Sequence, residues 1–133
     1  MTPEEDKRLC KEFPILYAQR HGNMRSTSMC WGFECGSGWF KLVRGLSAKL
    51  EAINRTVPED EQIHAMQVKE KFGTLRFYTN WSNEKASDLI DAAEKKSARI
   101  CETCGRPGKL RGTGWLTTLC SKCWKKSQEA KGK

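Results

Sequence analysis

The sequence predicts an α+β fold, in which helices pack around a small antiparallel hairpin and a cysteine-rich module follows at the C-terminal end. Three observations predict it. Apolar residues recur at helical spacing in three segments, residues 63–79 have the period of strands, and four cysteines form two Cys-x2-Cys pairs after residue 100. The 133 residues suit one domain. We expect a scaffold over residues 1–98 and a separate module over residues 99–133.

The first predicted element is a helix that starts at Thr2. Thr2 suits the N-cap, Pro3 the first helical position, and Glu5 lies three residues after the cap. Pro14 is expected to kink this helix or to start a second one, because proline cannot continue the hydrogen bonding of a helix interior. Gly22 is the expected stop. The apolar positions of this segment are Leu9, Phe13, Leu16 and Tyr17.

A glycine-rich, irregular stretch over residues 22–38 separates this helix from the next. Ser37 is the expected N-cap of the second helix, which runs from Trp39 to about Asn54, ahead of Pro58. Its apolar stripe has the helical spacing i, i+3, i+4, i+7. The stripe consists of Trp39, Leu42, Val43, Leu46, Leu50 and Ile53.

Residues 63–70 and 74–79 are predicted to form two strands joined around residues 71–73. Leu75 and Phe77 would then share one face of the hairpin, and Arg76 and Tyr78 the other. Ser82 is expected to cap a third helix. Its apolar stripe is Ala86, Leu89, Ile90, Ala93, Ser97 and Ile100.

The two cysteine pairs predict a zinc site formed by four thiolates. The ligands would be Cys101, Cys104, Cys120 and Cys123, since two intervening residues let one tight turn present two sulfurs to a tetrahedral ion. A knuckle, a hairpin with its tip at residues 112–114, and a helix from residue 121 would follow in the order of a treble-clef or zinc-ribbon-like module. Residues 100–133 have few large apolar side chains, so Zn²⁺ would supply much of the folding free energy.

The other three cysteines allow two interpretations. The chain has seven cysteines, and this odd number, with no secretory signal at the start, argues against a disulfide framework. One interpretation is a second metal site formed by Cys10, His21, Cys30 and Cys35. The other is that these cysteines are free thiols, which are common in the cores of cytosolic proteins.

The positive charge of the chain is confined to its C-terminal part. The formal net charge is +8, whereas residues 1–94 carry 13 basic and 14 acidic side chains, so residues 95–133 carry all of the excess. Such a segment predicts contact with nucleic acid or with an acidic face of a nucleoprotein complex. A zinc ion with four thiolates carries about −2, and the basic side chains partly compensate it. The candidate contact residues are Arg99, Arg106, Lys109, Arg111, Trp115, Lys122, Lys125 and Lys126.

Two classes of protein are disfavoured. The chain has no run of about 18 apolar residues, so no membrane span is expected. A non-catalytic protein is expected, because four cysteines close the coordination sphere of zinc and the two histidines show no metalloprotease spacing. Gln67 and Lys69, with the acidic residues 59–61, are only faintly similar to the metal site of a metal-dependent nuclease.

Four strings carry a resemblance to known proteins. They are Cys-Gly-Ser-Gly-Trp-Phe (35–40), Gln-Val-Lys-Glu-Lys-Phe-Gly-Thr-Leu-Arg-Phe-Tyr (67–78), Ile-Cys-Glu-Thr-Cys-Gly-Arg-Pro-Gly (100–108) and Gly-Trp-Leu-Thr-Thr-Leu-Cys (114–120). From about Cys30 to Trp124 the chain resembles small phage and prophage proteins without an assigned function. The resemblance implies a phage-type origin and a place in the bacterial host cytoplasm, and it supplies no catalytic residues.

This origin favours an alternative function. Small phage proteins often bind and block a host machine, such as a defence complex of the CRISPR type. Direct protein binding of that kind would use exposed aromatic anchors. The candidates are Trp31, Phe33, Trp39 and Phe40, although the last two also suit a core. The sequence predicts no oligomeric state.

Overall fold

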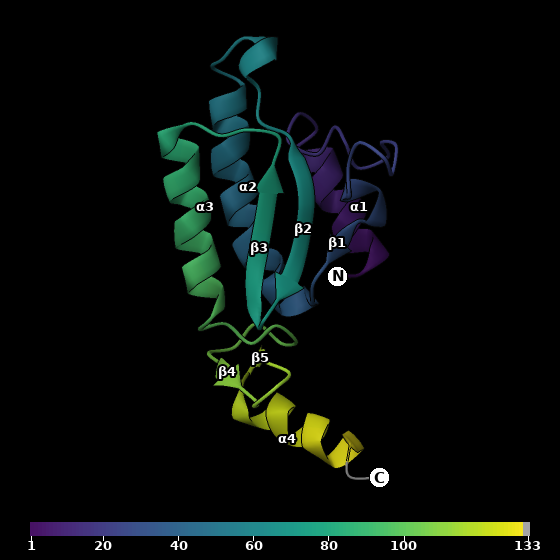
Figure 1. Ribbon diagram of the computed structural model, residues 1–133, viewed down its shortest axis with the longest axis vertical. Helices are drawn as coiled ribbons and strands as arrows, with labels where there is room; N and C mark the ends of the chain where they lie inside the picture. The colour runs from purple at the N-terminus through teal and green to yellow at the C-terminus, as the bar shows by residue number, and fades with distance from the viewer. Residues whose placement is uncertain (132–133) are drawn as a thin grey trace.

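The computed structural model describes residues 1–131, and the α+β class is confirmed within them (Figure 1). The described residues form four α-helices: α1 (Pro3–Glu12), α2 (Phe40–Asn54), α3 (Glu84–Ser97) and α4 (Ser121–Lys131). They also form a three-stranded sheet of β1 (Phe33–Glu34), β2 (Ala65–Lys71) and β3 (Thr74–Thr79), and a two-stranded sheet of β4 (Lys109–Arg111) and β5 (Thr117–Leu119). Within residues 1–131, no helix is both long enough and apolar enough to cross a bilayer.

Helix α1 starts as predicted and ends earlier than its apolar pattern implies. The Glu5 backbone N–H donates to Oγ1 of Thr2 at 3.1 Å, and the Thr2 N–H donates to Oε1 of Glu5 at 2.9 Å, which completes a capping box. The helix ends at Glu12, and residues 14–21 form turns. Pro14 therefore neither kinks the helix nor begins another. The turns still bury Leu16 and Tyr17 in the core.

Helix α2 forms the centre of the core. Its predicted stripe is correct, with Trp39 and Leu50 fully buried. The predicted cap is wrong, because Ser37 begins a short 3-10 turn and the N-cap position falls on Trp39 with no side-chain hydrogen bond. At the other end of the helix the buried Glu51 carboxylate accepts hydrogen bonds from the backbone N–H groups of residues 15 and 16 at 3.1 and 2.8 Å. This carboxylate ties the turns after α1 to the core.

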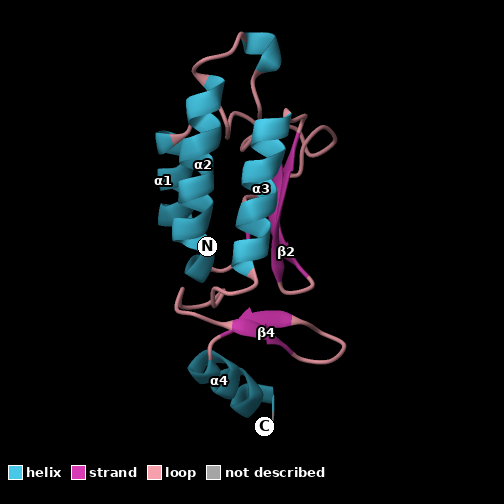
Figure 2. Ribbon diagram, turned by 90° about the vertical axis from the view of Figure 1, so that its left-hand side faces the viewer, coloured by secondary structure: helices cyan, strands magenta, loops and turns pink. Residues whose placement is uncertain are grey.

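The sheet contains the predicted hairpin and one strand that was not predicted. β2 and β3 pair antiparallel, and the short β1 pairs parallel with β2, which gives the order β1-β2-β3. Helices α2 and α3 cover one face of this sheet, and its other face is open (Figures 1 and 2). Val68, Leu75 and Phe77 point to the covered face and are buried. The core therefore lies between the sheet and the helices.

Helix α3 covers the outer edge of β3 with two side chains. The backbone N–H groups of Leu75 and Phe77 donate to Oγ of Ser97 at 2.8 Å and to Oε2 of Glu94 at 2.9 Å. These bonds satisfy strand donors that would otherwise be free to pair with another chain. The helix is capped by Asn83 and not by Ser82 as predicted, because the Ala86 N–H donates to Oδ1 of Asn83.

Gly45 lies in the middle of α2 and offers a simple test of this helix. It is exposed, and a Cβ added there would meet nothing within 4 Å. We expect Gly45→Ala to raise the free energy of unfolding by about 1 kcal/mol, because alanine loses less backbone entropy than glycine in a helix. Urea denaturation of the two proteins measures this. A destabilised variant would show that α2 does not have this helical register.

Candidate metal centre and the basic groove beside it

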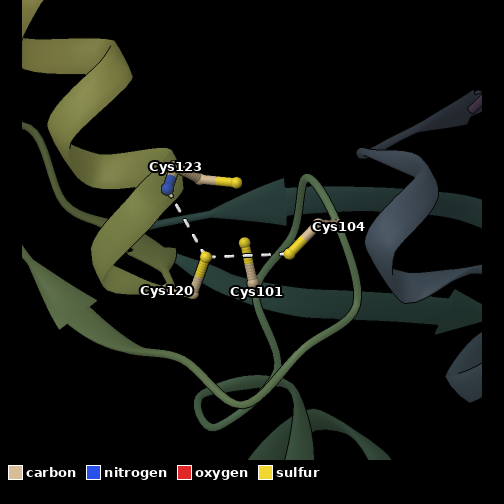
Figure 3. Close-up of side chains that lie close together, drawn as sticks. All are labelled: Cys101, Cys104, Cys120 and Cys123. Carbon is tan, nitrogen blue, oxygen red and sulfur yellow. Dashed lines mark hydrogen bonds between the residues drawn. The ribbon is translucent and has the colours of Figure 1, made fainter.

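The four predicted ligands lie together at one point of the C-terminal module (Figure 3). The sulfur atoms of Cys101, Cys104, Cys120 and Cys123 all lie within 4.8 Å of one another, and those of Cys104 and Cys120 are 3.7 Å apart. In a tetrahedral thiolate site with metal–sulfur bonds of about 2.3 Å, neighbouring sulfurs are about 3.8 Å apart. The cysteine cluster is therefore a candidate metal site.

Local backbone geometry presents the first pair of sulfurs. After α3, residues 101–105 turn back on themselves, with the Gly105 N–H donating to the Cys101 carbonyl at 2.9 Å and the Cys101 N–H to the Arg106 carbonyl at 2.8 Å. Gly105 has a φ of +81°, a conformation that glycine adopts without strain. The sequence predicted this knuckle from the Cys-x2-Cys spacing.

The second pair lies where β5 gives way to α4. β5 ends at Leu119, Cys120 follows it, and Cys123 lies in the first turn of α4. The backbone N–H of Cys123 points at Sγ of Cys120 at 3.4 Å. Strand, ligand and helix thus follow one another without an intervening loop, so both sulfurs have fixed positions.

The electrostatics of the cluster favour bound positive charge. The hydrogen bond from the Cys123 N–H lowers the pKa of the Cys120 thiol to about 6. Burial opposes ionisation of Cys101, yet backbone N–H groups around it lower its pKa as well. Burial and the neighbouring sulfurs raise the pKa of Cys123 to about 12. Four such thiols can all ionise only when a cation offsets their repulsion, as in a metal–thiolate site.

Three hydrogen bonds hold the knuckle against the scaffold. The Gly38 N–H donates to the Glu102 carbonyl at 2.7 Å, and the Gly36 N–H donates to the Glu102 carboxylate at 2.9 Å. The indole Nε1 of the buried Trp39 donates to the carbonyl of Ile100 at 2.8 Å. The segment before α2 therefore fixes the backbone on both sides of Cys101.

The hairpin turn of the larger sheet makes a second contact with the module. Oγ1 of the buried Thr118 donates to the carbonyl of Gly73 at 2.6 Å, and the Glu102 N–H donates to the Thr118 carbonyl at 3.0 Å. A Cβ on Gly73 would lie 2.3 Å from Cδ1 of Leu110. Parts of all four strings that carried the sequence resemblance meet in this junction and in the knuckle beside it. The division at residue 98 stays a prediction, since these bonds cross it.

A groove of about 740 Å³ opens beside the cysteine cluster. Trp115, in the loop between β4 and β5, lies at this groove with 78% of its surface exposed, so it is not part of a core over the metal. Trp124 is half-buried. The basic side chains of the groove are Arg106, Lys122, Lys126 and Lys131. We call this surface, with Trp115, the module groove.

The other predicted contact residues lie elsewhere. Nε of Arg111 donates to the Leu119 carbonyl of β5 at 2.9 Å, and its Nη2 donates to Oγ of Ser121 at 3.3 Å, so this side chain connects the small hairpin to the start of α4. Arg99 lies in a different hollow, beside β3 and α3. Lys109 and Lys125 are exposed but do not line the groove. Lys131 of α4 lines the groove and was not among the predicted contact residues, although a helix from residue 121 was predicted.

The structure does not bring the second candidate ligand set together. Among residues 1–131, Cys10, His21, Cys30 and Cys35 form no group of three or more within ligand distance. The Cys10 and Cys30 thiols instead donate locally, to Oδ1 of Asp6 and to the Thr27 carbonyl. Burial raises the pKa of Cys10 and of Cys35 to about 12, which keeps both as neutral thiols.

Comparison of the chain with protein-family models, with curated proteins and with solved structures gave no match. The phage-type origin, the host cytoplasm and the absence of catalysis stay predictions.

The acidic residues 59–61 form a 3-10 turn after α2. In the described part of the chain, these three carboxylates belong to no group of three or more side chains that could hold a metal ion. The functional argument therefore begins from the cysteine cluster and the groove.

Proposed function

We propose that the cysteine cluster binds one structural Zn²⁺ ion. Four thiolates in a tetrahedron suit zinc and leave no open position for a substrate, which is typical of sites that stabilise a fold. We propose that the module is of the treble-clef or zinc-ribbon-like type, because a knuckle, the hairpin β4–β5 and a helix carrying a ligand in its first turn follow in that order. The proposal is supported by the 3.7 Å sulfur–sulfur contact between the two pairs.

We propose that the zinc module makes the protein a non-catalytic binder of nucleic acid, with the module groove as the contact surface. The observation that carries this proposal is the exposed Trp115 ring beside four basic side chains. Within residues 1–131, these four form no ion pair with an acidic side chain. Free cations attract phosphates, and an exposed indole stacks on an unpaired base. This combination favours single strands.

The groove proposal predicts different effects for two lysines of α4. Lys122 lines the groove, whereas Lys125 is exposed on the same helix outside it. Lys122→Glu is expected to weaken the binding of a single-stranded oligonucleotide about tenfold at low salt, because it replaces a phosphate contact with repulsion. Lys125→Glu changes the net charge equally and is expected to have a much smaller effect. Fluorescence anisotropy titrations at two salt concentrations compare them.

Two outcomes would contradict the groove proposal. One is equal weakening by Lys122→Glu and Lys125→Glu, which would show that only net charge matters. The other is no binding of either RNA or DNA single strands by the unaltered protein at low salt. A combined change of Lys122, Lys126 and Trp115 should abolish binding if the groove is the site.

A second candidate function is direct inhibition of a bacterial defence complex by protein binding. It is favoured by two exposed apolar side chains in the irregular segment before β1, Met24 at 65% and Trp31 at 62% exposure. Phe33 and Trp39 do not serve as anchors, because both are buried, and Phe40 is half-buried. Affinity capture from host lysate separates the two functions: a partner that is retained after nuclease treatment binds the protein directly, and a partner lost on treatment was bridged by nucleic acid.

A further inference from the structure

The open face of the larger sheet carries a second basic and aromatic surface. Helices α2 and α3 cover the opposite face (Figure 2). Strand pairing places Lys69 opposite Arg76 and Gln67 opposite Tyr78 on the open side, since the alternating Val68, Leu75 and Phe77 are buried. We call this surface the open sheet face. It comprises Gln67, Lys69, Lys71, Thr74, Arg76 and Tyr78.

Acidic side chains lie beside two of the three cations of this face without forming an ion pair with them. Lys69, Lys71 and Arg76 form no ion pair and no side-chain hydrogen bond within residues 1–131. Glu34 of β1 lies opposite Lys69, and its carboxylate accepts from the Gln67 amide at 3.4 Å. Glu94 borders Arg76 at the outer edge, so Lys71, which pairs with Thr74, is the cation most available to an anion.

Aromatic side chains lie at both ends of this row of cations. Tyr78 is 44% exposed at one end of the face, and Phe72 is 63% exposed in the turn at the other end. Nζ of Lys71 lies 5.6 Å from the centre of the Phe72 ring. Phe72 has a φ of +54°, a left-handed conformation that a bulky residue adopts only at a cost in energy. The turn thus holds an aromatic ring in solvent where asparagine or glycine would be less strained.

The module lies at the end of the molecule to which the turn between β2 and β3 points (Figure 1). The turn at Gly73 contacts Leu110 of β4 and Thr117 of β5. The loop between β4 and β5, which contains Trp115, extends toward the side that the open sheet face occupies (Figure 2). The turn that carries Phe72 is therefore the point at which the open sheet face meets the module.

We propose that the open sheet face binds single-stranded nucleic acid and extends the path that begins in the module groove. This inference rests on the proposed function of the groove. Lysines in line with exposed rings are the combination that binds a single strand, since the phosphates meet cations and the bases stack. A sheet with one open face bearing aromatic residues is also a common platform for such strands.

The test uses the full-length zinc-loaded protein and homopolymeric oligonucleotides, RNA and DNA, of about 6 and about 18 nucleotides, which bracket common site sizes. We expect Lys69→Gln with Lys71→Gln to lower the salt slope of 18-mer binding by about 1.4, since each single-strand phosphate contact contributes about 0.7. Lys49→Gln is the matched control, because Lys49 is exposed on α2, on the helical side of the molecule. It should leave the slope unchanged.

A second pair of variants tests stacking apart from charge. Tyr78→Ala is expected to weaken 18-mer binding by about 5- to 100-fold, whereas Tyr78→Phe keeps the ring and should bind as the unaltered protein does. Zinc content and thermal unfolding show that the variants fold. The sheet proposal is overturned if the unaltered protein, the double lysine variant and Tyr78→Ala all bind the 18-mer equally well. That outcome would favour a protein partner for the open sheet face. Absence of oligonucleotide binding by the unaltered protein overturns the groove proposal as well.

Discussion

Cys101→Ser is expected to unfold the C-terminal module and to lower its metal content well below one ion per chain. Cys101 is fully buried among the four sulfurs, and its neighbours on both sides are hydrogen-bonded to the scaffold. Between residues 99 and 131, the buried apolar side chains are those of Cys101 and Leu119. Such a core cannot fold by itself, and structural zinc supplies on the order of 10 kcal/mol to modules of this kind.

Metal analysis and limited proteolysis measure the effect of Cys101→Ser. Trypsin should cleave the variant quickly after Lys109 and Arg111, which are followed by leucine and glycine, and leave the scaffold of α1 to α3 resistant. Cys30→Ser is the matched control, because the Cys30 thiol only donates to the Thr27 carbonyl and a serine hydroxyl can do the same. A Cys101→Ser protein that keeps a full complement of metal and resists trypsin would contradict the account.

Gly38→Ala is expected to separate the module from the scaffold without replacing any of the four cysteines. An added Cβ would lie 2.1 Å from the Cys101 carbonyl oxygen and 2.5 Å from the Glu102 carbonyl carbon. Both are backbone atoms, so no change of side-chain rotamer can relieve the clash. Relief requires the knuckle to move and the bond from the Gly38 N–H to Glu102 to break. The free energy of unfolding should fall by about 1–3 kcal/mol, or more, and zinc should dissociate faster.

Chelator competition and urea denaturation measure these two quantities for Gly38→Ala. Gly45→Ala serves as the control, because the same change in open space is expected to stabilise the protein. If Gly38→Ala kept both the stability and the zinc dissociation rate of the unaltered protein, the knuckle would not depend on the segment before α2.

Local patterns made much of the fold predictable. The capping box of α1, the stripe of α2 and the hairpin of β2 and β3 arise from residues close together in the chain, and the sequence predicted each of them. β1 was not predicted, because a two-residue strand has no period and its pairing of Phe33 with Val68 depends on distant residues. Asn83 rather than Ser82 caps α3, a choice between adjacent capping residues that propensity does not settle.

The sequence was sufficient to predict the four cysteine ligands of the candidate site, but not the surfaces around it. Cys-x2-Cys spacing specifies the four sulfurs because each pair lies within one turn. The open sheet face was not predicted as a basic surface. The charges of Lys69, Glu70 and Lys71 sum to only +1 when they are counted along the chain. Strand alternation separates them, and the Glu70 carboxylate instead accepts the Gly73 N–H at 2.7 Å. A charge count by strand face, rather than by segment, would have revealed it.

X-ray absorption at the zinc edge tests the central claim most directly, namely that four cysteines hold one structural zinc ion beneath the module groove. The protein should contain one zinc per chain, with four sulfur atoms at about 2.3 Å and no nitrogen or oxygen neighbours. Less than one zinc per chain after zinc-replete purification, or a coordination shell containing nitrogen or oxygen, would contradict the claim.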